Sequence, residues 1–156
     1  KEKELAPMNN IPISPEAVEI LKKYGARLTL EEEFFAAVYR DDREEIKSMV
    51  EAGFPIDTVL DRSTCLQVAI RHENIHLVRF LIKLGADVNF NKIPYTPLFS
   101  AITTKRGDIV ECLLENGADL NLPGEGGISA WKGVELQLLH LTEEVGVILQ
   151  AKRREP

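Results

Sequence analysis

The sequence has few of the residues that mark a disulfide scaffold. Its 156 residues include only two cysteines, one tryptophan and 6% aromatic residues. Two cysteines are too few for a disulfide framework, and Cys65 and Cys112 both fall in apolar stretches with helical spacing. We therefore expect two free thiols in a reducing compartment, which predicts a cytoplasmic, intracellular protein.

Long apolar runs and an excess of positive charge are also missing. No window approaches the ~18 uninterrupted apolar residues of a membrane span, so we expect no contact with the membrane. The formal net charge is -6, and this argues against a nucleic-acid partner because phosphate neutralisation needs a basic stripe. An acidic chain leaves room for a basic protein partner attracted at long range, although acidity also serves solubility.

One 13-residue stretch organises the chain. It reads LVRFLIKLGADVN at residues 77–89, IVECLLENGADLN at residues 109–121 and, more faintly, EIKSMVEAGFPID at residues 45–57. The three copies start 32 residues apart, and each has glycine at its ninth position. A fixed period of this size indicates a stacked repeat array, in which each unit buries its apolar face only against its neighbours.

Each unit is predicted to hold two short antiparallel helices and an extended, hairpin-like link. Thr64 and Thr96 suit the N-cap of the first helix in two successive units, and Pro97 suits its first position. Apolar residues spaced for one side of a helix continue through the second helix, up to the glycine that ends it. Neither helix can bury its apolar face alone, so the units must stack.

The ends of the array are predicted to be capping elements. At the start we expect a helix from Ser14 to about Tyr24, stopped by Gly25, and then a capping box at Thr29–Glu32 that opens the next helix. At the end we expect a helix through Val134, Leu136, Leu138 and Leu139 and a last helix over Val145–Lys152, with a polar outer face.

These patterns divide the chain into one all-α repeat domain with two short flanks. We expect a flexible N-terminal segment at 1–13, the repeat domain at 14–152 and a tail at 153–156. Within the domain, the expected units are a capping helix (14–28), three repeats (29–58, 59–89 and 90–121) and a degenerate C-terminal capping repeat (122–152).

The central units resemble the ankyrin repeat. The family pattern reads T-P-L-H-x-A-A, then V-V-x-L-L-L, then G-A-D-V-N, and its counterparts here are Thr96-Pro97-Leu98, Ala101, Ile109-Val110, Leu113-Leu114 and Gly117-Ala118-Asp119-Leu120-Asn121. Residues 64–89 match nearly as well and 32–57 weakly. The resemblance implies an ankyrin-repeat solenoid of about three repeats between capping helices. It also implies a protein that binds other proteins, without a cofactor and without catalysis.

Two departures from the family pattern concern positions with a structural role. The histidine after T-P-L, which in the family braces the hairpin by hydrogen bonds, is replaced by Gln67, Phe99, Phe35 and Trp131. Phenylalanine and tryptophan cannot make those bonds, so we expect lower local stiffness. The glycine between the two helices is replaced by Asp41, Glu73 and Lys105. A non-glycine residue at positive φ is uncommon and costly, so we expect these turns to be rearranged or strained.

Residues 72–76 form an H-E-x-x-H motif, the sharpest chemical signal in the sequence. On one continuous helix, two histidines four residues apart bind zinc and the glutamate acts as a general base. The repeat register instead puts His72 at the end of one helix and His76 at the start of the next, and no third ligand is marked out. A zinc hydrolase through His72, Glu73 and His76 is a remote alternative, and we expect no metal.

The register also marks a surface for a protein partner, at the hairpin tips and the concave face formed by the first helices. The residues there are Tyr39, Arg40, Leu60, Asp61, Ser63, Arg71, His72, Lys92, Ile93, Tyr95, Thr103, Thr104 and Glu125. Tyrosine and arginine are common hot-spot residues in interfaces. An exposed Leu60 and Ile93 beside them would form an apolar patch with a polar rim.

The leading hypothesis is therefore a monomeric adaptor or inhibitor that binds one protein. An alternative within the binding class is an immunity-type or antitoxin-type neutraliser, whose acidic face covers the basic active site of an enzyme. The acidic runs Glu31–Glu33 and Asp41–Glu45 are typical of solvated faces, and the alternative is that they form an acidic end which receives a basic partner.

Overall fold

The computed structural model describes residues 16, 20, 23–25 and 27–153. The expected flexible segment at 1–13, most of the expected capping helix at 14–24 and tail residues 154–156 lie outside the described residues. Gly25 is described and has a φ of 75°, the left-handed conformation expected where the first helix stops. In the described part, no helix has the length and apolar content to cross a lipid bilayer.

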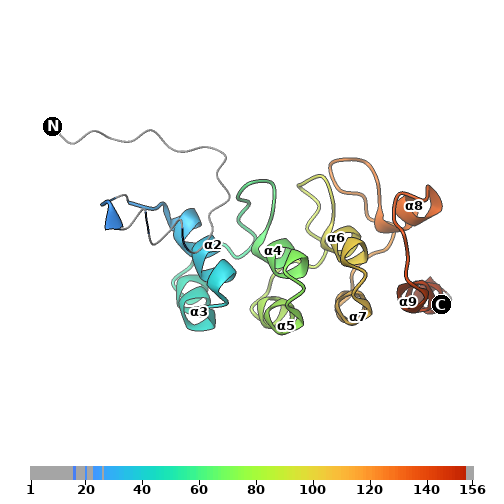
Figure 1. Ribbon diagram of the computed structural model, residues 1–156, viewed down its shortest axis with the longest axis horizontal. Coiled ribbons are helices and arrows are strands. Elements are labelled where there is room, and N and C mark those ends of the chain that lie inside the picture. The colour runs from blue at the N-terminus through green and yellow to red at the C-terminus, as the bar shows by residue number, and fades with distance from the viewer. Residues whose placement is uncertain (1–15, 17–19, 21–22, 26, 154–156) are drawn as a thin grey trace.

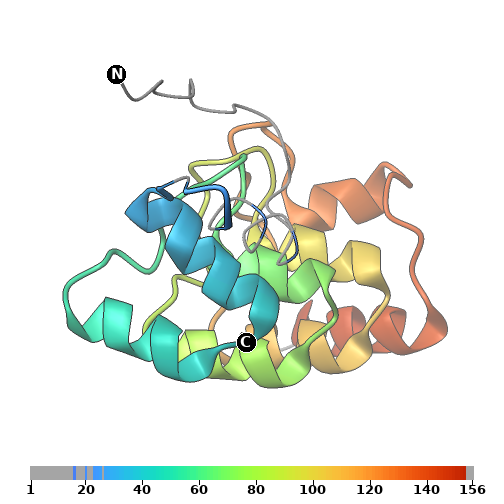
Figure 2. The ribbon, with the colours of Figure 1, turned by 60° about the vertical axis from the view of Figure 1, so that its left-hand side comes forward.

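The described helices form two rows that run along the length of the molecule (Figure 1). The inner row holds α2 (Leu30–Arg40), α4 (Cys65–Arg71), α6 (Pro97–Thr104) and α8 (Ala130–Glu135). The outer row holds α3 (Arg43–Glu51), α5 (Ile75–Lys83), α7 (Gly107–Glu115) and α9 (Glu143–Arg153). Each inner helix packs on the next inner helix, and α5, α7 and α9 follow one another in the outer row (Figure 2). The all-α ankyrin-type solenoid predicted from the sequence is confirmed.

Side-chain caps fix where the inner helices begin. Thr64 and Thr96 accept the backbone N–H of the residue three positions on, at the start of α4 and α6. The predicted capping box at Thr29 is present, because its hydroxyl accepts the Glu32 N–H and the Glu32 carboxylate accepts the Thr29 N–H. Thr142 likewise accepts the Val145 N–H and opens α9, close to the predicted start.

The turns between the two helices of each repeat keep the left-handed conformation without glycine. Asp41, Glu73 and Lys105 have φ values of 53°, 54° and 60°. The turns are therefore strained and not rearranged, because an L-residue in this conformation crowds its Cβ against the backbone. The glycines that end the outer helices, Gly53 and Gly85, have φ values of 97° and 100°, as the 32-residue register predicts.

One apolar core runs through all the units. Its largest fully buried side chains come from both rows and are Phe34, Phe35, Ile46, Leu66, Ile70, Leu81, Leu98, Ile102, Ile109, Leu113 and Leu149. Burying a side chain of this size stabilises the fold by about 1.5–3 kcal/mol. Because the core is continuous, the inner helices hold the loops beside them in fixed relative positions.

The C-terminal end differs from the prediction. Helix α8 ends at Glu135, with Gln137 at a φ of 57°, so the expected helix through Leu139 is wrong. The exposed surface of this unit is less polar than the expected polar outer face. Four apolar side chains of this last unit are exposed, with exposed fractions of 51%, 56%, 36% and 63% for Leu136, Leu138, Leu141 and Val147.

Candidate functional site

A groove runs along the inner helices and the loops that precede them. Its first half, a hollow of about 590 Å³, is lined by Asp61, Arg62, Ser63, Gln67, Arg71, Pro94, Tyr95 and Ser100. Its second half, a hollow of about 480 Å³, is lined by Arg71, Tyr95, Phe99, Ser100, Thr103, Ile128, Leu138 and Leu139. Three residues line both halves, so the hollows adjoin, and together they are named the inner groove.

Two contacts fix the loop that carries Tyr95 in the middle of the inner groove. The buried Gln67 amide donates a hydrogen bond to the Tyr95 carbonyl at 2.7 Å, and its oxygen accepts the Thr64 N–H at 3.3 Å. The Tyr95 ring stacks on Phe99 with 4.4 Å between ring centroids and 16° between planes. Gln67 thus makes hairpin hydrogen bonds in place of the family's histidine, whereas Phe99, one repeat further, supports the same loop only by stacking.

Arginines supply most of the charge in the inner groove. Arg71, the last residue of α4, donates from Nη1 to the Ser63 hydroxyl at 2.8 Å. Neither Arg71 nor Arg62 forms an ion pair with a described residue, in contrast to Arg40, Arg43 and Arg106 elsewhere on the surface. The positive charge of Arg62 and Arg71 is therefore open to a ligand that enters the groove.

The structure brings five of the thirteen residues proposed from the sequence into the inner groove: Asp61, Ser63, Arg71, Tyr95 and Thr103. The other eight lie outside it: Tyr39, Arg40, Leu60, His72, Lys92, Ile93, Thr104 and Glu125. Among these, Tyr39 and His72 contact each other edge to face at 5.4 Å, and Arg40 pairs with Glu45 at 2.7 Å. Leu60 and Thr104 are half-buried, and Lys92 and Glu125 are exposed.

Two of the predicted surface residues are buried. Ile93 is 4% exposed and Ser63 is 6% exposed. Ile93 is covered because the loop of the next repeat packs on the loop that contains Ile93. In this contact the Glu125 N–H donates to the Ile93 carbonyl at 2.9 Å. A side chain at Gly124 would collide with the Ile93 and Pro94 carbonyls, so glycine permits this close approach. The predicted apolar patch of Leu60 and Ile93 is therefore wrong.

The sequence did not point to eight residues that line the inner groove. These are Arg62, Gln67, Pro94, Phe99, Ser100, Ile128, Leu138 and Leu139. Register alone could have found Arg62 and Pro94, because they stand 32 residues apart at equivalent loop positions. Nothing in the sequence signals that Leu138 leaves the helix and faces the groove.

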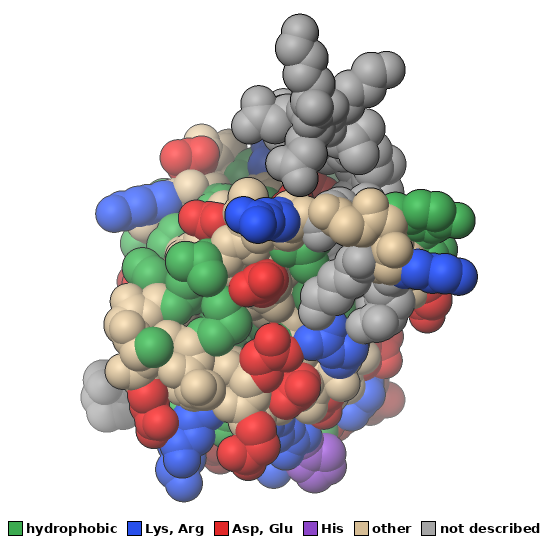
Figure 3. Space-filling model, turned by 90° about the vertical axis from the view of Figure 1, so that its left-hand side faces the viewer, with side chains coloured by type: hydrophobic (Ala, Val, Ile, Leu, Met, Phe, Trp, Pro, Cys, Tyr) green, Lys and Arg blue, Asp and Glu red, His purple; other side chains and the backbone are tan. Residues whose placement is uncertain are grey.

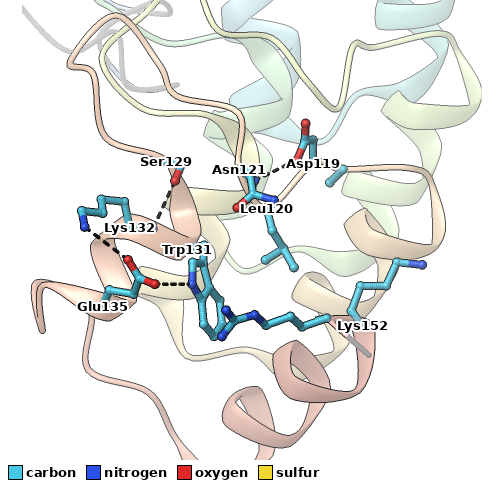
Figure 4. Close-up of a pocket in the computed structure, with 10 residues that line it drawn as sticks. Asp119, Leu120, Asn121, Ser129, Trp131, Lys132, Glu135 and Lys152 are labelled. Atoms are coloured by element: carbon cyan, nitrogen blue, oxygen red, sulfur yellow. Dashed lines mark hydrogen bonds and ion pairs between the residues drawn. The ribbon is translucent and has the colours of Figure 1, made fainter. Parts of the chain in front are cut away.

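A separate hollow of about 640 Å³ lies at the C-terminal end, beside Trp131 and outside the inner groove (Figure 4). Its charged groups are largely engaged with one another. The Trp131 indole N–H and the Lys132 ammonium both donate to Glu135, at 2.8 and 3.3 Å, and the Arg153 guanidinium lies 4.4 Å from the centre of the Trp131 ring. The two contacts of Glu135 lie within α8, whereas the Arg153–Trp131 contact links α9 to α8, so we interpret this cluster as closure of the stack.

The H-E-x-x-H motif crosses a turn. His72 is the C-cap of α4, Glu73 has a φ of 54°, and His76 lies in the first turn of α5. The two histidines therefore do not share one continuous helix, which the zinc hydrolase hypothesis requires. Within residues 16, 20, 23–25 and 27–153, no three His, Cys, Asp or Glu side chains gather closely enough to hold a metal ion.

Both cysteines are free and buried, as predicted. Burial is the main cause that raises the pKa of Cys65 to about 12. Burial also raises the pKa of Cys112, although Arg79 opposes this shift. A thiol with a raised pKa is a poor nucleophile at neutral pH, so both side chains act as small apolar residues of the core.

The N-terminal end of the stack carries mixed charge. Acidic and basic side chains are interspersed over the face seen in Figure 3. The acidic run Asp41–Glu45 is partly neutralised, because Asp41 pairs with Arg43 at 2.9 Å and Glu45 pairs with Arg40. The hydrogen bond from Arg43 is the largest cause that lowers the pKa of Asp41.

Comparison with known proteins gives one consistent result. A family model described as "Ankyrin repeats (3 copies)" matches residues 34–123. An ankyrin repeat protein of fowlpox virus (strain NVSL) is 42% identical over 65 residues, which are 40% of this chain and 19% of the viral protein. Human 2-5A-dependent ribonuclease is 43% identical over 61 residues, which are 38% of this chain and 8% of the ribonuclease.

Among solved structures, the ankyrin repeat domain of Bcl-3 superimposes with a TM-score of 0.66 at 24% sequence identity. The match covers 88% of this chain and 63% of that chain, and it shows the shared fold. The chain spans less than a fifth of the length of both curated relatives.

Proposed function

The chain belongs to the ankyrin repeat family, and we propose that it is a non-catalytic module that binds one partner protein through the inner groove. Ankyrin repeats bind other proteins, and the fold is typically an interaction module without catalysis. The proposal goes further, because it commits to one surface of this chain and to one partner at a time, with the protein acting as a monomeric adaptor or inhibitor in the cytoplasm.

The observation that carries this proposal is the position of Tyr95 and Arg71 in the inner groove. Tyr95 is 47% exposed, and its loop is held by Gln67 and Phe99. Interface hot spots are enriched in tyrosine and arginine, which combine a large contact area with a polar group. A surface that is already fixed loses little conformational entropy on binding, which favours affinity.

The alternative of a neutraliser that covers a basic enzyme has less support. It needs a broad acidic surface, whereas Asp41 and Glu45 are paired with arginines and the inner groove itself carries Arg62 and Arg71. The proposed adaptor or inhibitor requires only the groove, so we retain it as the function that the geometry supports best.

Affinity capture from an extract of the source cells tests this proposal. We would compare the wild-type chain with Arg71→Gln/Tyr95→Ala and with a control altered on the outer row and last helix, Lys83→Gln/Val147→Ala. The control residues are exposed and lie outside the inner groove. Circular dichroism and thermal melting establish that all three chains are folded.

The expected result is a protein captured by the wild type and the control but lost with the groove variant. Removing a central interface residue typically costs about 1–2 kcal/mol or more, so two such losses weaken affinity by roughly 30-fold or more. Equal capture by a folded groove variant would refute the assignment of binding to this groove.

A further inference from the structure

We propose that the inner groove receives an acidic segment of the partner that also carries a large apolar side chain. This inference rests on the proposed function, because it names the chemistry of the occupant of the same groove. It reverses the expectation of a basic partner, which came from the net charge of -6.

The charge of the inner groove is opposite to that of the whole chain. Its charged residues are Arg62, Arg71 and Asp61, and its second half contains Arg71 alone. None of the three is in an ion pair with a described residue, so the arginines are not neutralised from within the structure. A carboxylate of a partner can accept two parallel hydrogen bonds from a guanidinium, the strong and directional form of this contact.

The second half of the inner groove is mostly apolar. The Tyr95 ring stacked on Phe99, together with Ile128, Leu138 and Leu139, forms its walls. Leu138 is 56% exposed, so part of this apolar wall is open to solvent. The hollow of about 480 Å³ falls within the range of roughly 300–1,000 Å³ of sites that enclose a small ligand. A leucine, isoleucine or aromatic side chain therefore has a place to enter.

Arg71 brings the positive charge next to the apolar walls, because it lines both halves of the inner groove. When an apolar side chain of the partner enters beside Leu138, an acidic residue a few positions away in the same segment can reach Arg71, since an extended chain advances about 3.3 Å per residue. A basic segment in the same position would place its charge against Arg62 and Arg71, and such like-charge contact suppresses binding.

Selection of random linear peptides displayed on phage against the wild-type chain tests this chemistry. Selected peptides are then synthesised, and their affinities are measured by fluorescence anisotropy for three variants. Arg62→Gln/Arg71→Gln removes the groove charge, Tyr95→Ala/Leu138→Ala removes the apolar walls, and Lys83→Gln/Lys105→Gln is the charge-matched control. Lys83 and Lys105 are exposed and lie outside the inner groove.

We expect peptides in which Asp or Glu lies within a few positions of Leu, Ile, Phe or Trp. Their affinity should fall at least 10-fold with either groove variant and should be unchanged with the control. It should also weaken as salt rises from about 50 to about 500 mM, because salt screens exposed charges, and the arginine variant should lose most of that dependence.

Three results would overturn the inference: basic peptides in the selected pool, no enriched peptides, or acidic peptides that the arginine variant binds as well as the wild type.

The inference about acidic chemistry and the proposed function of the groove can fail separately. If neutral or basic peptides lose affinity with Tyr95→Ala/Leu138→Ala, the groove binds peptides and only the acidic chemistry is wrong. If neither groove variant affects any selected peptide, the proposed function fails as well.

Discussion

Asp57 and Asn89 occupy equivalent positions 32 residues apart, but they make unequal contacts with the next repeat. The Asn89 amide donates to the Gly117 carbonyl at 2.9 Å and accepts the Asp119 N–H at 2.8 Å. Asp57 accepts the Asp87 N–H at 3.0 Å, and its carboxylate has no hydrogen to donate to Gly85, the counterpart of Gly117. We predict that Asp57→Asn stabilises the fold.

The expected gain has two sources. A new hydrogen bond from residue 57 to the Gly85 carbonyl contributes about 0.5–1.5 kcal/mol net. The substitution also removes a partly buried carboxylate whose pKa is raised. Burial is the largest cause of the raised pKa, and the Asp87 carboxylate adds to it, whereas the hydrogen bond from the Asp87 N–H opposes it. We therefore expect at least about 1 kcal/mol at pH 7, or a rise in Tm of about 2–4 °C for a chain of this length.

The pH dependence follows from the raised pKa of Asp57. The folded protein holds the proton of the Asp57 carboxyl more tightly than the unfolded protein does. The free energy of unfolding therefore falls as pH rises from the ordinary pKa of 3.8 through the raised pKa. The advantage of Asp57→Asn should be complete at pH 7 and should shrink as pH falls towards 4.

Urea unfolding at pH 7 and pH 4 measures both effects, with the reverse change Asn89→Asp as the matched control. That control loses the bond to Gly117 and should destabilise the fold by about 1 kcal/mol at pH 7. The reasoning is refuted if Asp57→Asn is no more stable than wild type at pH 7, or if its gain is the same at both pH values.

Three further predictions concern the turns, the thiols and the Tyr95 loop. Lys105→Gly should raise the free energy of unfolding, measured with urea, by about 1 kcal/mol, because glycine relieves the strain of the positive φ of 60°. The exposed lysine side chain forms no hydrogen bond or ion pair with a described residue, so little is lost with it. An unchanged urea midpoint would count against the strain. Cys65 and Cys112 should not react with a disulfide reagent at pH 8 until the protein unfolds, since both are buried; rapid labelling of native protein would contradict this. Gln67→Ala should cost about 1–3 kcal/mol and speed amide exchange around Tyr95, because it leaves the Tyr95 carbonyl without its partner; unchanged exchange there would show that Phe99 alone fixes the loop.

The sequence predicted the parts of the fold that depend on local chemistry. The threonine caps, the glycines after the outer helices and the 32-residue period each act over a few residues or repeat regularly, so they can be recognised in one dimension. The placement of His72 and His76 on different helices also followed from register, and the structure confirms it.

The errors arose where distant segments meet or where an apolar pattern stops early. Ile93 is buried because the loop containing Gly124 packs on it, a contact between residues from successive repeats that the sequence of one loop does not reveal. Val134 and Leu138 stand four residues apart, as on one face of a helix, but α8 ends at Glu135 and the left-handed turn at Gln137 precedes Leu138.

The groove was only partly visible in the sequence for the same reason. Arg71 and Tyr95 could be placed by register, since each occupies a defined position in its repeat. That Arg71 pairs with no acidic group among the described residues depends on which side chains surround it in space, and the bond from Gln67 to Tyr95 spans two repeats. Net charge alone therefore suggested a basic partner, the opposite of the acidic segment that we propose for the groove.

Photo-cross-linking is the most direct measurement of whether the inner groove is the binding surface. A benzophenone amino acid would replace Tyr95 in one chain, Leu138 in a second and the exposed Val147 of α9 in a third, and each would be irradiated with the captured partner. Cross-links from positions 95 and 138, to a partner segment rich in Asp and Glu, with little product from position 147, are the predicted result. Efficient cross-links from position 147 with none from positions 95 and 138 would contradict the account.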